Sequence, residues 1–193
     1  MIANTILQVK ENECTGCGAC FNKCPVQAIQ MVENSEGFLF PHINESTCIH
    51  CGQCLAVCPV HKVEYQNLNE PECYAACAND DIRMDSSSGG IFTLAAQYIL
   101  DQNGYVCGAA YTDNFEKVEH ILISDESELS CLRGSKYVQS DMGQNYRKIQ
   151  EILKDGKLVL FTGCPCQVAG LYKFLGHEYD NLFTIDLVCH GVP

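Results

Sequence analysis

The sequence predicts two folded units in series: a small α+β unit, followed by an α/β unit whose sheet is partly parallel. Three observations predict them. Eight of the 15 cysteines lie in two regular runs before residue 60. From about residue 84, helical periodicity alternates with short apolar runs of the kind that parallel sheets bury. A polar segment that contains Pro71 lies between them. We therefore expect units over residues 1–66 and 84–193, joined by a linker over residues 67–83.

Composition narrows the range of partners and locations. With 24 acidic and 12 basic residues the chain has a formal net charge of −12, which repels a phosphate backbone, so no nucleic-acid partner is expected. A hydrophobic content of 47% with 19% charged residues supports a packed core. The sequence shows neither a long apolar run nor a signal-peptide pattern. We therefore expect a soluble, cytoplasmic protein without membrane insertion.

The cysteines of the first unit follow one pattern twice. In each copy, three cysteines are spaced three residues apart, and a fourth lies four residues further on, before a proline. With this C-x2-C-x2-C-x3-C-P spacing, three thiolates hold one iron–sulfur cubane and the fourth reaches a second cubane. The sequence therefore predicts a ferredoxin-like dicluster unit with two [4Fe-4S] clusters and crossed ligands. Cluster 1 takes Cys14, Cys17, Cys20 and Cys58, and cluster 2 takes Cys48, Cys51, Cys54 and Cys24.

Two other interpretations of these cysteines stay open. A zinc site uses paired C-x2-C knuckles, and free thiols are often simply buried. Disulfides are not expected, because the sequence has no export signal and a cytosol is reducing. Gly16, Gly18 and Gly52 lie between the ligands, where the chain has to turn tightly and direct its amides at sulfur.

The remaining elements of the first unit follow from local patterns. Residues 28–33, 34–37 and 38–42 predict a strand, a turn and a second strand. Residues 5–10 and 63–66 are expected to add two more strands. Histidine rarely ligates a cubane, so ordinary surface or core roles are expected for His42, His50 and His61.

The linker contains two cysteines of its own. Cys73 and Cys77 are four residues apart, a helical spacing that places both thiols on one face. We interpret them as buried side chains, because a free cysteine commonly behaves as a small hydrophobe. Ligands of an additional metal center and redox-active thiols are the alternatives.

The second unit is expected to begin with a helix. Residues 86–90 read Ser-Ser-Ser-Gly-Gly, and apolar residues follow at helical spacing. This stripe, which predicts an amphipathic helix ending before Gly104, consists of Ile91, Leu94, Ala95, Tyr98 and Ile99. Small residues at a helix start let backbone amides approach an anion, so a phosphate or pyrophosphate is one expected ligand. A serine cap on an ordinary helix is the alternative.

Further strands and helices alternate along the second unit. Strands are expected over residues 105–112, 118–124, 158–162 and 182–188, and helices over residues 125–132, 143–154 and 168–175. A strand, a helix and a strand in succession imply a parallel crossover. Such sheets bind ligands beyond the carboxyl ends of their strands, where residues 163–167 and 189–193 lie.

Five cysteines follow the linker. Cys164 and Cys166 lie at a predicted helix N-terminus, where the helix dipole stabilises a thiolate. Their C-P-C spacing is one residue shorter than the C-x-x-C of redox dithiols, so a strained dithiol and buried thiols are the alternatives. Cys189 and His190 follow a strand, which suits a ligand or active-site role. The other two cysteines are expected in the core, namely Cys107 and Cys131.

Four motifs of the second unit form an ordered series: Ser-Ser-Gly-Gly at 87–90, Gly-Ser-Lys-Tyr at 134–137, Gly-Cys-Pro-Cys-Gln at 163–167 and Cys-His-Gly-Val-Pro at 189–193. In order and spacing, residues 84–193 resemble the coenzyme F-420 hydrogenase/dehydrogenase beta-subunit family, and the dicluster unit in front is similar to an arrangement common in that family. The resemblance implies a flavin-dependent oxidoreductase subunit. Such proteins pass electrons between [4Fe-4S] clusters and an organic acceptor such as a deazaflavin-type coenzyme, and relatives reduce chlorophyll-type pigments.

The resemblance also implies a cofactor and partners. These are FAD, a redox partner protein or subunit, and a small-molecule electron acceptor. The implied catalytic residues are Lys136, which would offer a cation to the flavin, and Cys166 and His190, which would lie near the ring or ligate a further center. The implied cofactor-binding residues are Ser87, Ser88, Gly89, Gly90, Gly134, Ser135, Lys136 and Tyr137.

The sequence departs from the family pattern in two places. Cys164 stands where the family loop usually has threonine. The chain ends at Pro193, directly after a predicted strand, so we expect the N-terminal half of a longer protein with an incomplete sheet. The alternative function is a non-catalytic ferredoxin-type electron carrier or assembly subunit, and a zinc-binding structural protein is a more distant one.

Overall fold

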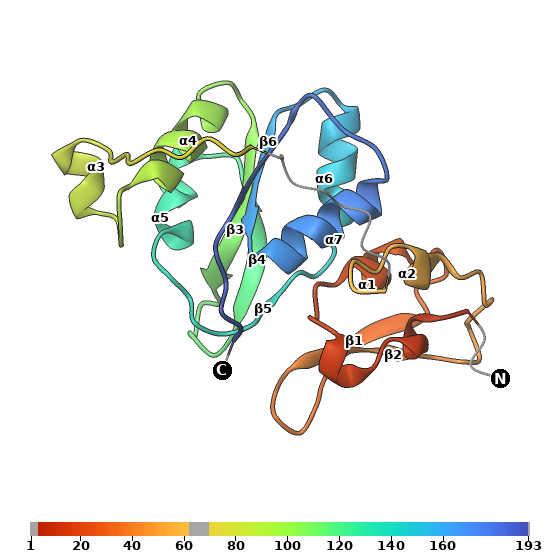
Figure 1. The fold of residues 1–193 in the computed structure, drawn as a ribbon. Helices are drawn as coiled ribbons and strands as arrows, with labels where there is room; N and C mark the ends of the chain where they lie inside the picture. The colour runs from red at the N-terminus through yellow and green to blue at the C-terminus, as the bar shows by residue number, and fades with distance from the viewer. Residues whose placement is uncertain (1–3, 62–69, 193) are drawn as a thin grey trace.

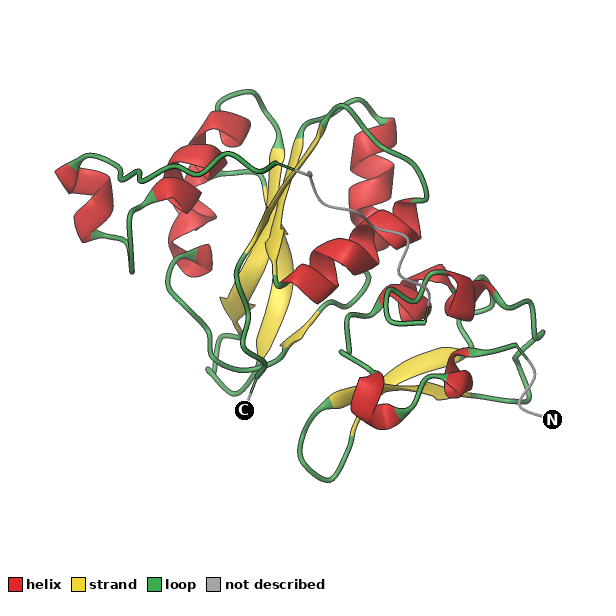
Figure 2. Cartoon of the chain, in the orientation of Figure 1, coloured by secondary structure: helices red, strands yellow, loops and turns green. Residues whose placement is uncertain are grey.

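The computed structural model describes residues 4–61 and 70–192. Two separate sheets divide these residues into an N-terminal and a C-terminal unit (Figure 1). The N-terminal unit has a two-stranded sheet, and the C-terminal unit has a five-stranded sheet with helices on both faces (Figure 2). The predicted order, an α+β unit followed by an α/β unit with a partly parallel sheet, is confirmed.

The N-terminal unit contains the predicted hairpin. Strands β1 (Ile29–Glu33) and β2 (Leu39–Ile43) pair in antiparallel fashion. Asn34 shapes the turn between them, because its side chain accepts hydrogen bonds from the amides of Glu36 and Phe38, both at 3.0 Å. Two short helices lie over this sheet, and each carries the third cysteine of one run: α1 (Ala19–Lys23) and α2 (Gln53–Ala56).

Residues 5–10 do not form the predicted strand. They contain a single 3-10 turn, η1 (Ile6–Gln8), which is followed by a second one, η2 (Glu11–Glu13). The side chain of Ile6 is buried, and its amide donates to the sulfur of Cys54 at 3.3 Å. Because this amide bonds to a cysteine, it is not available to a strand partner. The other predicted strand, over residues 63–66, lies outside the described residues.

The C-terminal sheet has the strand order β5-β4-β3-β6-β7. Its strands are β3 (Tyr105–Tyr111), β4 (Val118–Ile123), β5 (Ser140–Asp141), β6 (Val159–Gly163) and β7 (Leu182–Asp186). Strands β3 and β4 are antiparallel, whereas β6 runs parallel to both β3 and β7. The short apolar run of β6 is therefore buried between two parallel neighbors, as its composition predicts.

Helices cover both faces of this sheet (Figure 2). One face carries α4 (Ile91–Leu100), η3 (Glu126–Glu128) and α5 (Leu129–Leu132), and the other carries α6 (Asn145–Lys154) and α7 (Pro165–Leu175). A short helix, α3 (Asp80–Met84), precedes α4. Helix α7 begins three residues earlier than predicted, because Pro165 suits the first position of a helix.

Helix α4 buries only part of the face that its sequence predicts, because Ile99 is buried but other positions of the stripe are exposed. Three positions of the predicted stripe are 44, 41 and 62% exposed: Ile91, Leu94 and Tyr98. The fully buried positions are Thr93, Ala96 and Ile99. The small side chains of Thr93 and Ala96 let the helix lie close to the sheet, which explains why this face turns inward.

Three cysteines lie in surroundings that the sequence did not predict. Cys73 and Cys77 are exposed, and their segment has no helix, so the predicted shared helical face and burial are wrong. This segment instead runs beside the start of α4, where the amide of Ala78 donates to the carbonyl of Gly89 at 2.7 Å. Cys131 is exposed rather than in the core, because α5 turns its two leucines inward.

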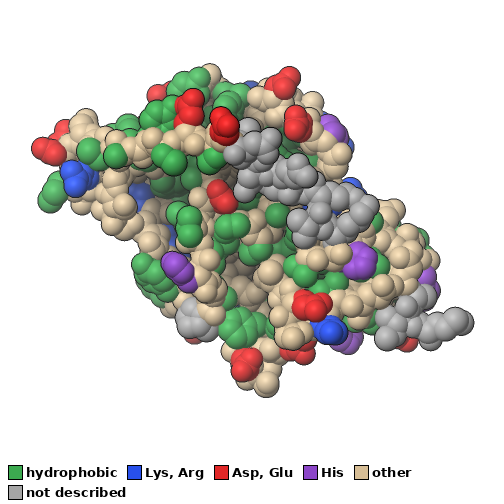
Figure 3. Space-filling model, in the orientation of Figure 1, with side chains coloured by type: hydrophobic (Ala, Val, Ile, Leu, Met, Phe, Trp, Pro, Cys, Tyr) green, Lys and Arg blue, Asp and Glu red, His purple; other side chains and the backbone are tan. Residues whose placement is uncertain are grey.

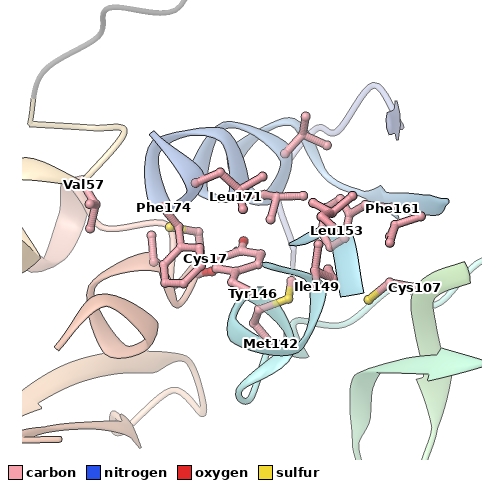
Figure 4. Close-up of a cluster of buried hydrophobic side chains, with 14 residues drawn as sticks. Cys17, Val57, Cys107, Met142, Tyr146, Ile149, Leu153, Phe161, Leu171 and Phe174 are labelled. Carbon is pink, nitrogen blue, oxygen red and sulfur yellow. Dashed lines mark hydrogen bonds between the residues drawn. The ribbon is translucent and has the colours of Figure 1, made fainter. Parts of the chain in front are cut away.

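The two units share one hydrophobic core (Figure 4). The N-terminal unit contributes Cys17, Ala19 and Val57, while Tyr146, Leu171 and Phe174 are among the contributions of α6 and α7. Figure 4 shows the ring of Phe174 and the ring of Tyr146 next to Cys17. A cysteine of the first run is thus part of the packing between the units.

The surface is acidic, as the net charge of −12 requires. Acidic side chains are scattered over both units on the face drawn in Figure 3. Within residues 4–61 and 70–192, none of the helices combines the length and the apolar character needed to cross a bilayer.

Candidate functional site

Two pockets in the N-terminal unit collect the eight cysteines of the repeated pattern. The first pocket is lined by Cys14, Cys17, Cys20 and Cys58, together with apolar side chains that include Ile6, Met31 and Val60. The second is lined by Cys24, Cys48, Cys51 and Cys54, with Ile29 and Ile43 among its apolar neighbors. Each cysteine run therefore sends three thiols to one pocket and one thiol to the other.

The four thiols of each pocket line a cavity and do not converge on one position, as the ligands of a single metal ion would. Among the described residues, no three Cys, His, Asp or Glu side chains meet closely enough to hold a single ion. Four thiols around an apolar pocket match the ligand set of a [4Fe-4S] cubane. The donors that are present therefore fit two such clusters.

Backbone turns direct the chain around these pockets. Gly16, Gly18 and Gly52 all adopt left-handed conformations, with φ between 64 and 76°. A Cβ atom at Gly16 would lie 2.8 Å from the carbonyl oxygen of Leu39, so the position requires glycine for space as well as for conformation. Amides also point at sulfur: Ala28 donates to Cys24 at 3.2 Å. Such donors stabilise thiolates that bind metal.

Burial makes these thiols costly to ionise without a cation. It raises the pKa of Cys17 to about 12 and also raises the pKa values of Cys14, Cys20 and Cys54. Iron reverses this preference, because a coordinating thiol is deprotonated by the charge of the metal. The first pocket, which holds three of these four thiols, is therefore suited to a metal cluster.

The first pocket lies directly against the C-terminal unit. The hydroxyl of Tyr146 lies 3.0 Å from the carbonyl oxygen of Cys17 and 2.8 Å from that of Gln167 in α7. A Cβ atom added at Gly170 would lie 3.2 Å from the sulfur of Cys17, so α7 passes very close to this ligand. Burial raises the pKa of the Cys166 thiol, and an interaction with the side chain of Thr15, between two ligands, partly offsets this rise.

Three further thiols meet where β6 and β7 end. Cys164 and Cys166 begin α7, and Cys189 follows β7. The two strand ends stay paired, because the amide of Leu187 donates to the carbonyl of Gly163 at 3.0 Å. Burial, together with the neighboring thiol of Cys189, raises the pKa of Cys164 to about 12.

A buried chain of hydrogen bonds supports the Cys164 loop. The amide of Cys164 donates to Gln167 Oε1 at 2.8 Å, and Gln167 Nε2 donates to Ser140 Oγ at 2.9 Å. Ser140 Oγ lies 3.0 Å from His120 Nδ1, and His120 Nε2 lies 3.1 Å from the carbonyl oxygen of Thr162. A carbonyl only accepts, so His120 is protonated on Nε2 and accepts from Ser140. Burial lowers the pKa of His120 to about 4 and keeps the ring neutral.

The first predicted cofactor segment, Ser87 to Gly90, lies against the chain itself. Gly90 is the N-cap of α4 in a left-handed conformation, and no side chain caps the helix, so the alternative of a serine cap is wrong. A Cβ atom at Gly90 would lie 2.9 Å from Cβ of Ala78. The space that a side chain at these glycines would need is therefore filled, at least in part, by the residues that precede α3.

The second predicted segment, Gly134 to Tyr137, follows α5. Lys136 folds back on this helix and donates to the carbonyls of Cys131 at 3.1 Å and Arg133 at 2.8 Å. Burial lowers the pKa of its ammonium. Ser135 and Tyr137 lie at the surface, and Gly134 has open space around it.

Arg133 joins the two predicted segments, and the sequence interpretation assigned it no role. Its guanidinium lies 3.7 Å from the carboxylate of Asp85, just before Ser87. Its Nε atom is buried and has no hydrogen-bond partner among the described residues. The sequence feature that could have identified Arg133 as a site residue is its position directly before the Gly-Ser-Lys-Tyr motif.

The three predicted catalytic residues are not joined by the described contacts. Cys166 is half-buried beside Thr15 and Cys189, Lys136 caps α5, and His190 is exposed beyond β7. Sequence reasoning also missed Tyr146 and Arg147, whose roles depend on contacts more than 100 residues away.

Comparisons with known proteins agree with this organization. Residues 13–62 match the family described as 4Fe-4S dicluster domain, and residues 73–144 match the family described as coenzyme F420 hydrogenase/dehydrogenase, beta subunit N-term. No curated protein shows a significant match. One similar solved structure is a xenon-derivatized F420-reducing [NiFe] hydrogenase complex from Methanosarcina barkeri, with 20% identity and a TM-score of 0.46. The match covers 59% of this chain and 42% of that chain. The resemblance expected from the motifs and the presence of two [4Fe-4S] clusters are confirmed.

Proposed function

Because the chain joins a 4Fe-4S dicluster domain to the N-terminal domain of a coenzyme F420 hydrogenase/dehydrogenase beta subunit, we propose that it is an electron-transferring oxidoreductase subunit. Cluster 1 is held by Cys14, Cys17, Cys20 and Cys58, and cluster 2 by Cys24, Cys48, Cys51 and Cys54. The grouping of these thiols around two pockets supports both ligand sets. Electrons pass between a partner subunit and a small organic acceptor through the two clusters.

The packing of the first pocket against α7 is the observation that carries this proposal. Cys17 belongs to the core shared by both units, and Thr15 contacts Cys166. The second pocket has the opposite character, because Cys51 is exposed and Ile49 is 60% exposed. Cluster 2 is thus accessible to a partner protein, while cluster 1 faces the α/β unit. Electrons therefore enter or leave the protein at cluster 2 and exchange with the α/β unit at cluster 1.

The α/β unit holds FAD in this proposal. Bound FAD would exchange single electrons with the clusters and electron pairs with an organic acceptor. Arg133 is the residue best placed to bind a phosphate, because its buried Nε has no partner among the described residues and guanidinium groups bind phosphate well. Gly134 and the start of α4 would line the same site. Lys136 positions this loop through the carbonyls at the end of α5, and Cys166 faces cluster 1.

The ligand sets are tested by removing one cysteine from the full-length protein, purified without oxygen. Cys24→Ala should lower the iron content from about eight to about four per chain. It should also expose Cys48, Cys51 and Cys54 to an alkylating reagent, as mass spectrometry would show, while the first three cysteines stay protected. Cys107→Ser is the control, because this buried thiol lies in β3. If Cys24→Ala exposes Cys14, Cys17 and Cys20 instead, the crossed sets are wrong.

The flavin site is tested with a matched pair of arginines. Arg133→Met should lower the flavin content and acceptor reduction and leave the cluster absorption near 400 nm unchanged. Arg83→Met is the control, because Arg83 is exposed on α3. If neither variant changes flavin content, these loops do not hold the cofactor. If the full-length protein binds no flavin but its clusters still reduce, the alternative of a simple electron carrier is favored.

A further inference from the structure

A short segment of the α/β unit, residues 139–143, lies against the ligand loop of the proposed cluster 1. A Cβ atom at Gly18 would lie 3.1 Å from Cβ of Met142, which is buried and is one of the labeled side chains in Figure 4. At the end of the segment, the carbonyl of Gly143 accepts a hydrogen bond from Asn22 Nδ2 at 2.8 Å. The segment is thus held on the first cysteine run at two points.

The segment begins with Gln139, whose side chain reaches the same loop. Gln139 Oε1 accepts a hydrogen bond from the amide of Leu39 at 2.7 Å. Because a backbone amide only donates, the oxygen of Gln139 has to face Leu39, and this contact fixes the orientation of the side-chain amide. Nε2 is then the side-chain atom closest to the position that a Cβ atom at Gly16 would take. The donor end of Gln139 is therefore held against Gly16, which lines the first pocket between Cys14 and Cys17.

The position of Gln139 is fixed by the next residue of the chain. Ser140 is buried in β5, and its Oγ lies 2.9 Å from Gln167 Nε2 and 3.0 Å from His120 Nδ1. Gln139 itself is only partly exposed, so water screens its amide dipole less than it would at an open surface. A polar group is thus kept at a fixed place beside the ligand loop.

We propose that Gln139 raises the reduction potential of cluster 1 and so favors electron flow from cluster 2 toward the α/β unit; this inference rests on the ligand sets of the proposed function. A [4Fe-4S] cluster gains one negative charge when it is reduced. A donor beside the ligand loop stabilises that charge, since hydrogen bonding and surrounding polarity are among the features that set cluster potentials. In this transfer cluster 2 loses one electron and cluster 1 gains it; no bond breaks and no proton is required.

The test is a redox titration of the full-length, iron-loaded protein, followed without oxygen by electron paramagnetic resonance. Gln139→Glu keeps the acceptor for Leu39 and replaces the donor with a negative charge. It should lower the equilibrium constant for electron uptake by one cluster about tenfold, which is about 59 mV for one electron. Gln139→Met loses the donor without gaining a charge, so it should lower the same potential by a smaller amount.

Two further variants provide the control and the assignment. Gln144→Glu introduces the same charge at an exposed residue whose side chain does not cap α6, and it should leave both potentials unchanged. Ile49 lines the second pocket, so Ile49→Glu should lower the potential of the other cluster. If Gln139→Glu and Ile49→Glu lower the same potential, the inference is overturned.

The remaining outcomes separate this inference from the proposed function. Unchanged potentials in Gln139→Met overturn the role of Gln139, even if the clusters still reduce an organic acceptor. Loss of iron from Gln139→Glu also overturns it, because the residue would then support the fold and not the potential. If the expected shifts occur but the clusters do not reduce bound flavin, the role of Gln139 stands and the proposed electron route fails.

Discussion

Arg147 is expected to stabilise the junction between the two units. From α6 it reaches the end of α1, where Nε donates to the carbonyl of Asn22 at 2.5 Å and Nη2 donates to that of Cys24 at 2.8 Å. A hydrogen bond to a charged group contributes about 1.5–3 kcal/mol. The Arg147 side chain is partly exposed, so the lower value applies to each bond. Arg147→Met should therefore lower the free energy of unfolding by about 3 kcal/mol, since the remaining contact, to Phe21, is long at 3.4 Å.

The assay is thermal unfolding of the full-length, iron-loaded protein. For a chain of this size, about 3 kcal/mol corresponds to a decrease in Tm of roughly 6–12 °C. Lys148→Met is the matched control, because Lys148 is the next residue of α6 and is exposed; an exposed substitution changes stability by less than about 0.5 kcal/mol. Amide hydrogen exchange should accelerate in residues 19–24 of Arg147→Met alone. Equal losses in both variants, or unchanged exchange in that segment, would refute the role of Arg147.

Three more predictions concern the clusters and the buried histidine. Gly16→Ala should lower the iron content, because its Cβ would press on a backbone carbonyl, while Gly37→Ala, with φ of 87° and open space, should cost only about 1–2 kcal/mol; equal iron in both variants would contradict this. Chelating the iron should release the amides of residues 4–61 to exchange and leave β6 protected, because four of the eight buried residues in the separate core cluster of the N-terminal unit are cysteines; retained protection would contradict it. The unfolded state binds a proton at His120 below about pH 6.5, and the folded state does so only below about 4, so its contribution to stability is complete at neutral pH and decreases as the pH falls. From about pH 7.5 to 5 the loss should be about 2 kcal/mol, and His120→Asn should show a shallower decrease in urea unfolding than the wild type.

The flavin interpretation changes most when the structure is considered. The motif at residues 134–137 drew attention to Lys136, yet its ammonium bonds to carbonyls of its own loop. The adjacent Arg133 has the buried donor without a partner among the described residues. The sequence motif locates the loop, but it does not show which cationic side chain of the loop already donates its hydrogen bonds to the protein itself.

Features that depend on local spacing can be predicted from the amino-acid sequence alone. The cysteine runs predict which thiols share a cluster, because C-x2-C-x2-C spacing limits what three neighboring thiols can reach. The hairpin at β1 and β2 follows from Asn34 and its flanking strand residues, and the buried β6 follows from its short apolar run. In each case the deciding interactions lie within a few residues of the chain.

Features that depend on partners far apart in the chain become visible only in the folded protein. Ile6 forms a turn because its amide meets Cys54, and α4 exposes Tyr98 because a smaller face fits the sheet. The start of α7 lies beside the end of β7 because two parallel strands end side by side, where the amide of Leu187 donates to the carbonyl of Gly163. The first cluster pocket lies on the α/β unit because Tyr146, more than 100 residues away, contacts the backbone of Cys17. Each of these contacts requires the whole chain to fold before its members meet, so local sequence patterns carry no signal of them.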